Sequence, residues 1–303
     1  MPIGADVSAQ YTEEAVGGGH PTKARVIDRL ALVEHHTDGK HKADRLPVGC
    51  GAYFEYSSAT QVRLVKAAGS GLNIGHAFYG DAVPFLDGSG NLYYLRLNGI
   101  VTKDNADLAA DMTYTAYAYD NNGAVAVELS TTGYTNAEII PTKTGDKTRT
   151  LVGILRTNSS SYFVNTATQR WVASFWNRVL RTAAADITTG STGNLIWTEM
   201  SQLTAVGFGG DQVTRAASGH QFNSMNNNAS VVTISGASLS GTTVNCPSSI
   251  HNNDSAGQAA GFGLRQTDAL GSTGMFSSFL YLRGVIGGTS SIGITRHEMA
   301  FWG

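Results

Sequence analysis

The fold class is decided by residues 112–129, which read MTYTAYAYDNNGAVAVEL. Between Met112 and Tyr119, apolar and threonine side chains alternate with a period of two, which is the spacing of a β-strand. Residues 121–123 (Asn-Asn-Gly) tolerate the positive φ angles of a tight turn, and the alternation resumes over residues 124–129. The stretch therefore predicts an antiparallel hairpin within a β-sandwich-like module.

Similar patterns on both sides of this hairpin predict two groups of strands. The first group comprises Ala52–Tyr56, Gln61–Ala67, Leu92–Leu97, Met112–Tyr119, Ala124–Leu129, Arg149–Arg156 and Arg170–Trp176. The second comprises Asn194–Met200, Leu203–Phe208, Ser230–Ser235, Phe276–Ile286 and Ile292–Thr295. Turn-forming clusters separate many of these runs. The expected protein is mainly β, with two antiparallel β-sandwich-like domains over residues 48–178 and 179–303, the second jelly-roll-like.

The N-terminal zone, residues 1–47, lacks the strand pattern of both groups. Residues 1–21 are Gly-rich and have no apolar period, so a short extended arm is expected there. Thr22 can cap a following helix of about fourteen residues, a length that is marginal for an isolated helix in water. Its apolar stripe consists of Val26, Ile27, Leu30 and Val33. The stripe needs a partner, either the same helix of two sister chains or the chain's own β-domain.

Composition narrows the functional classes. The chain has 303 residues and a net charge of −2, so it lacks the basic field that holds nucleic acid. No window reaches the roughly 18 uninterrupted apolar residues of a membrane span, and the N-terminus does not read as a signal peptide. Only 15% of residues are charged, against about 25% in an ordinary domain. This composition favours turn-rich β-structure and surfaces covered by neighbouring subunits.

The positions of the lysines and cysteines indicate which residues are expected to be buried or to lie in interfaces. No lysine follows Lys147, and arginine tolerates packed or interfacial positions better than lysine does. Cys50 and Cys246 are 196 positions apart and are expected to be free buried thiols rather than a disulfide.

Candidate catalytic and metal motifs are weak. His35, His36 and His41 could converge on one ion, but no cysteine or spaced fourth ligand accompanies them, so no metal or other cofactor is expected. His297-Glu298 begins a zinc-protease pattern that lacks its second histidine. The sequence contains no nucleophile elbow and no phosphate-binding loop. A non-enzymatic protein is predicted.

The tryptophans are expected to serve packing. Trp171 and Trp176 lie five residues apart in a strand-like run, so they should face opposite sides, with Trp176 in the core. Trp197, Tyr281 and Trp302 are expected in the core or in a subunit interface rather than as sugar platforms.

The central region resembles a module of bacteriophage virion proteins, chiefly tail fibres and similar appendages. The residues that carry the resemblance are Tyr114–Asp120 with Gly123, Ser130–Gly133, Thr144–Thr157 and Ala167–Arg178. They match a "tYYvYAY…G…leaSTTg" hairpin, a "tGDatRTLVGmvRT" strand and a closing "aTQRfVrSWfNR". The resemblance covers about a third of the chain and implies a structural role.

That resemblance implies a structural virion protein, made in the host cytoplasm: a short tail fibre or appendage that contributes to host attachment. Together with the short helix, it implies a homotrimer that docks on another virion protein through residues 1–47. A head fibre or capsid decoration protein is the alternative, and a glycan-cleaving tail spike is less favoured. Neither nucleic-acid binding nor membrane insertion is expected.

Receptor-binding residues are sought on polar loops of the C-terminal domain, because exposed loops carry recognition chemistry on a rigid scaffold. Two such loops are expected at Gly219–Ala229 and Ser248–Gly257, and their side chains could hydrogen-bond sugar hydroxyls of a host-surface glycan. The alternative is that they are solvated turns without a ligand. The candidates are Asn223, Asn226, Asn227, Asn228, His251, Asn252, Asn253 and Asp254.

Overall fold

The computed structural model describes residues 49–67, 81–192, 197–223, 229–238, 241–243, 248–252, 259–283 and 290–303. Within these ranges all 21 regular elements are β-strands and no helix occurs, which confirms the predicted β class. The expected arm over residues 1–21 and the helix stripe of Val26, Ile27, Leu30 and Val33 lie outside the described residues, as does Cys246.

The first sandwich contains two main sheets and a hairpin. One sheet has the order β1 (Ala52–Ser58), β2 (Gln61–Lys66), β5 (Val101–Asp104). The other has the order β7 (Ala124–Ser130), β6 (Thr113–Asn121), β10 (Asp146–Arg156), β9 (Thr142–Lys143), β8 (Tyr134–Thr135), with β12 (Val172–Ser174) also on β10. The hairpin pairs β3 (Ala82–Leu86) with β4 (Leu92–Arg96). All described pairings in this sandwich are antiparallel.

The predicted hairpin is strands β6 and β7. Asn121 pairs with Ala124, and the two turn residues between them have positive φ angles, 54° at Asn122 and 87° at Gly123. The Gly123 amide donates to Asp120 Oδ1 at 2.6 Å, which fixes the turn. The turn chemistry read from the sequence is thus confirmed.

The core of the first sandwich closes where β1 crosses β10. Phe54 is fully buried and its ring lies against Gly153, whose Cβ, if it had one, would stand 2.7 Å from the Ala173 carbonyl oxygen. The Phe54 amide donates to Ser174 Oγ at 3.1 Å. Only glycine lets the ring approach β10 this closely.

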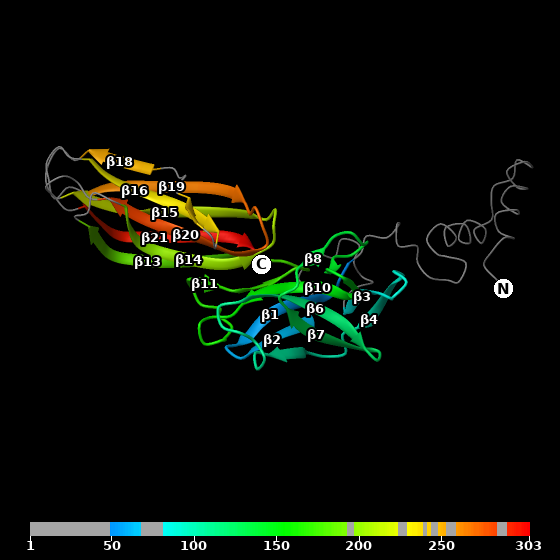
Figure 1. Cartoon of the computed structure of the whole chain (residues 1–303). Helices are drawn as coiled ribbons and strands as arrows, with labels where there is room; N and C mark the ends of the chain where they lie inside the picture. The colour runs from blue at the N-terminus through cyan, green and yellow to red at the C-terminus, as the bar shows by residue number, and fades with distance from the viewer. Residues whose placement is uncertain are drawn as a thin grey trace, which may run out of the picture.

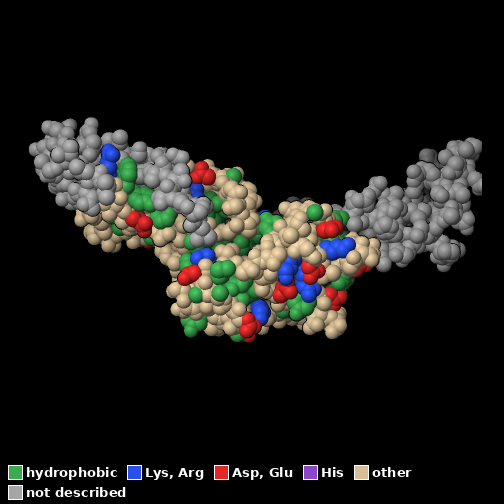
Figure 2. All heavy atoms as spheres, in the orientation of Figure 1, with side chains coloured by type: hydrophobic (Ala, Val, Ile, Leu, Met, Phe, Trp, Pro, Cys, Tyr) green, Lys and Arg blue, Asp and Glu red, His purple; other side chains and the backbone are tan. Residues whose placement is uncertain are grey.

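The second sandwich packs two sheets of long strands. One has the order β13 (Leu180–Thr192), β21 (Ser290–Trp302), β15 (Gln212–Asn223), β19 (Ala259–Ala269). The other has the order β11 (Gln169–Arg170), β14 (Trp197–Gly207), β20 (Gly274–Arg283), β16 (Ala229–Ser238), β17 (Gly241–Thr243), with β18 (Ser248–Asn252) also on β16. Figure 1 shows this sandwich extending from the first, with the C-terminus at the junction. On the face in Figure 2, charged side chains gather on the first sandwich.

Several strand predictions were wrong in their boundaries, including Ile292–Thr295, which is only part of β21. Arg170–Trp176 is not one strand, because β11 pairs with β14 of the second sandwich while β12 pairs with β10 of the first. Asn194–Met200 and Leu203–Phe208 are not separate, because β14 runs continuously from Trp197 to Gly207 with a register shift between Glu199 and Ser201. The division at 178/179 stays a prediction.

The two sandwiches share a core, here called the junction core. It comprises Tyr117, Leu151, Ile154, Val164, Trp171, Ala173, Val206 and Phe208. The Trp171 indole donates to Thr204 Oγ1 at 2.7 Å, and Tyr134 and Thr273 share a hydroxyl hydrogen bond of 3.1 Å. Apolar and polar contacts therefore both cross the boundary.

Residues 175–178, which connect the sandwiches, are held on three sides. The Trp176 indole donates to the Leu151 carbonyl at 2.8 Å, and Asn177 Nδ2 donates to the carbonyls of Cys50 and Ala52. Arg178 forms an ion pair of 2.5 Å with Asp211 and lies over the Phe208 ring. The segment is therefore a fixed joint.

Two apolar clusters follow the junction core along the second sandwich. The proximal core contains Ala183, Leu203, Ala205, Val213, Phe276, Met299 and Phe301. The distal core contains Ala217, Phe262, Leu264, Leu280, Leu282 and Ile292. Burial is thus distributed along the sandwich to its far end.

The tryptophans pack largely as predicted. Trp171 enters the junction core, while Trp176 packs against the core of the first sandwich. The two rings therefore face different cores. Tyr281 is buried, and Trp197 lies under the Arg283 guanidinium at 5.3 Å. Trp302 is 48% exposed beside its strand partner Leu180, so it lies outside the core of the single chain, and its placement in a subunit interface stays a prediction.

Candidate functional site

The predicted receptor loops are partly strands. β15 continues to Asn223, and residues 248–252, including His251 and Asn252, form β18. Both segments were read as loops because Ser and Asn have low strand propensity, but pairing with β21 and β16 overrides that preference. The other candidates, Asn226, Asn227, Asn228, Asn253 and Asp254, lie outside the described residues.

The strand pairings bring these segments to one end of the second sandwich. Asn223 pairs with Ser290, and Ser290 also pairs with Thr192. Ala229 pairs with Asn252 on the opposite sheet. These positions lie at the end far from the first sandwich (Figure 1).

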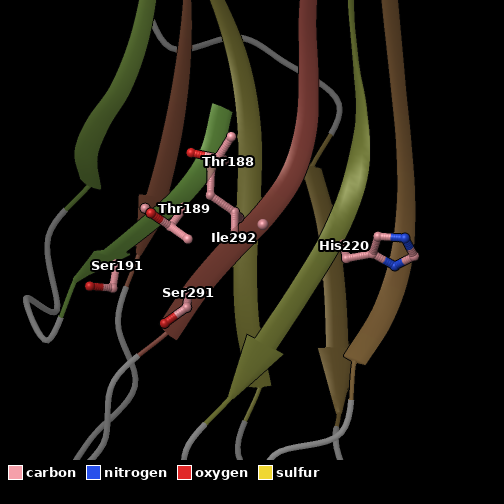
Figure 3. A pocket seen from close by; sticks show the side chains of 8 residues that line it. Thr188, Thr189, Ser191, His220, Ser291 and Ile292 are labelled. Carbon is pink, nitrogen blue, oxygen red and sulfur yellow. The ribbon is translucent and has the colours of Figure 1, made fainter. Parts of the chain in front are cut away.

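A hollow of about 580 Å³ lies at this far end. Its lining consists of Thr188, Thr189, Gly190, Ser191, His220, Ser291, Ile292 and Gly293. In Figure 3 the hydroxyl side chains come from β13 and β21, and the ring of His220, on β15, points away from them. Three adjacent strands of one sheet therefore build the hollow.

The accessible side chains of the hollow are polar. Thr188, Thr189, Ser191 and His220 are exposed. Ile292 is 1% exposed and packs in the distal core, so its side chain is not available to a ligand. A Cβ at Gly190 would approach Ile292 Cγ1 at 3.3 Å and Met200 Sδ at 2.9 Å, and the flexible Met200 side chain can move aside. The hollow therefore offers mainly hydroxyl groups.

Sequence reasoning missed these residues because it missed β13 and assigned only part of β21. The run Asp186–Thr192 (DITTGST) has small polar residues that read as a turn. Its hydroxyl density was the signal that could have identified a polar surface, but only the pairing with Ser290–Gly293 locates it.

A second polar group is buried between the sheets of the same sandwich. His297 is fully buried, with Nε2 at 2.8 Å from Ser278 Oγ and Nδ1 at 3.1 Å from Ser201 Oγ. Arg215, 4% exposed, donates to the Ser277 carbonyl and pairs with Asp268 at 2.7 Å. Burial, and secondarily the Arg215 charge, lowers the pKa of His297 to about 4. A neutral, enclosed imidazole serves packing here.

Metal and thiol chemistry find little support in the part of the chain that the structure describes. No group of three His, Cys, Asp or Glu side chains there is placed to hold a metal ion, and His35, His36 and His41 lie outside it. Cys50 is a free buried thiol, as predicted, and burial raises its pKa to about 12. No helix in the described ranges is long and apolar enough to cross a membrane.

No family model and no curated protein matches the chain. Among solved structures, the chain is similar to capsid structures of infectious bursal disease virus. The Gx strain structure has a TM-score of 0.30 and 9% identity over 82% of this chain and 71% of that one. The VP2 subviral particle has a TM-score of 0.30 and 10% identity over 73% and 63%. The Bacillus thuringiensis delta-endotoxin Cry8Ea1 has a TM-score of 0.25 and 7% identity over 83% and 52%. Scores of this size carry no functional conclusion.

Proposed function

We propose that the chain is a structural bacteriophage virion protein, a short tail fibre or appendage whose second sandwich points outward and contributes to host attachment. The resemblance of residues 114–178 to phage appendage modules supports the class. In this proposal residues 1–47 dock on another virion protein, and three copies associate through the stripe of Val26, Ile27, Leu30 and Val33. The protein acts without catalysis, as part of the virion.

The observation that carries the proposal is the hollow at the far end of a fixed two-sandwich body. The junction core and the Arg178–Asp211 ion pair join the second sandwich to the first, and the described chain enters the first sandwich at Gly49. A recognition surface at the opposite end is the arrangement that an appendage needs. Three copies would multiply a weak contact with the host surface.

Labelling of particles tests this proposal. Fab fragments raised against the full chain and selected for binding residues 179–303 are expected to decorate tail appendages in negatively stained particles. The same Fab fragments are expected to block adsorption to host cells, whereas Fab fragments against the β6–β7 hairpin, equally bound, should block less.

Labelling distributed over the head, with adsorption unchanged, would instead establish the head fibre or decoration role. Failure of both Fab sets to bind particles would contradict a virion location.

A further inference from the structure

We propose that the far-end hollow binds an uncharged saccharide. The inference rests on the proposed function, because it names the ligand class of the same attachment site. The volume of about 580 Å³ falls within the range of roughly 300–1,000 Å³ typical of small-molecule sites. It is large enough for a short saccharide.

The hydroxyl set suits such a ligand. Thr188, Thr189, Ser191 and Ser291 each offer one donor and two acceptor positions. Sugar hydroxyls donate and accept at once, so side chains with the same dual capacity can satisfy neighbouring hydroxyls on a ring.

The described residues favour a neutral sugar over an acidic one. Among the lining residues that the structure describes, none is Asp, Glu, Lys or Arg. Arg296, on the same strand as Ser291, is engaged by Asp186 at 2.9 Å and by Glu298. A sialic or uronic carboxylate would therefore lose hydration without gaining an available cation.

None of the lining residues that the structure describes is aromatic, and their exposed hydroxyl groups set the expected affinity. Binding by a few exposed hydrogen bonds should be weak, with a dissociation constant on the order of 1 mM per site. Attachment would then depend on several copies acting together.

Saturation-transfer NMR on the full chain tests the inference. The probes are neutral oligosaccharides of glucose, galactose, mannose and N-acetylglucosamine, with sialylated and uronic-acid oligosaccharides as the acidic set. The test variant is Thr189→Val with Ser291→Ala. The matched control is Thr214→Val with Thr267→Val, which removes a hydroxyl pair at 2.9 Å on the same sheet outside the hollow.

We expect at least one neutral probe to bind, the test variant to bind it at least tenfold more weakly, and the control to bind as the parent chain does. Melting temperatures of the parent and both variants verify that each is folded. Equal weakening in both variants, a preference for acidic probes, or no neutral binding at 10 mM ligand, a limit set at about ten times the expected constant, would overturn the inference. Adsorption still blocked by the Fab fragments against residues 179–303 would then leave the proposed function standing with a different ligand.

Discussion

At the residue scale, His297 links the packing of the second sandwich to pH. Its folded-state pKa is about 4, against an ordinary value of 6.5. Between these values the unfolded chain binds a proton that the folded chain does not. The contribution of His297 to the free energy of unfolding is therefore fully present above pH 6.5. It is lost as the pH falls to 4 and below, by about 3 kcal/mol in all.

Urea unfolding at pH 7 and pH 4.5 checks this expectation. His297→Gln, which cannot titrate, should remove most of the pH-dependent loss that arises from this site. His220→Gln, at an exposed position, should retain it. An unchanged pH dependence in His297→Gln would show that other groups produce the loss.

Gly153 gives a second prediction at the residue scale, which concerns the stability of the first sandwich. Gly153→Ala should lower the free energy of unfolding by about 1–3 kcal/mol, because the new methyl group would meet the Phe54 ring and the Ala173 carbonyl. Gly263→Ala, in strand β19 with open space around its Cα, is the matched control and should change stability little. Chemical denaturation at pH 7 measures both, and equal effects would argue against a steric role for Gly153.

At the element scale, strands could be predicted from the sequence where large apolar side chains alternate with small or polar ones. The β6–β7 hairpin could be predicted because Tyr and Val alternate with smaller residues around an Asn-Gly turn. Strands β13, β15 and β19 could not, because they are rich in Ala, Gly and Ser, which give no strand signal, and they are ordered by pairing with distant partners. The hollow depends on two of these strands, so its location required the structure.

The joint between the sandwiches gives a prediction at this scale. Arg178→Ala removes the ion pair to Asp211 and the contacts with Phe175 and Phe208. It should cost on the order of 2 kcal/mol, since the pair is charged and largely buried. Calorimetry should show the two sandwiches melting further apart in temperature than in the parent chain.

Arg296→Ala is the matched control for the joint. Its ion pair with Asp186 joins two strands within one sandwich and is exposed on both sides, so removal should change little. If Arg178→Ala and Arg296→Ala gave the same melting profile, the joint would not depend on this ion pair.

At the scale of the whole molecule, the expected assembly is a homotrimer. Light scattering at micromolar concentration should give three times the chain mass of 31.9 kDa. Replacing Val26 and Leu30 with Gln should yield monomers, because the apolar stripe loses its burial. Asp28→Asn, on the polar side of the expected helix, should leave the trimer intact. A monomeric parent chain would contradict the proposed assembly.

The arm is expected to serve docking alone. Deleting residues 2–21 should leave a folded trimer that no longer incorporates into particles, because these residues are too polar and Gly-rich to form a core of their own. Complementation of a deletion phage, followed by detection of the protein on purified particles, measures this. Normal incorporation would exclude the arm as the docking segment.

The fixed joint also has a mechanical consequence. A pull on the far end of the second sandwich passes along β14 to Val206 of the junction core and along β13 to residues 175–178. From there Asn177 passes it to the carbonyls of Cys50 and Ala52. The body between Gly49 and the far-end hollow thus acts as a lever arm without a hinge. When the far-end hollow is held, a tension or torque on it would move the first sandwich. It would not be taken up by bending between the two sandwiches.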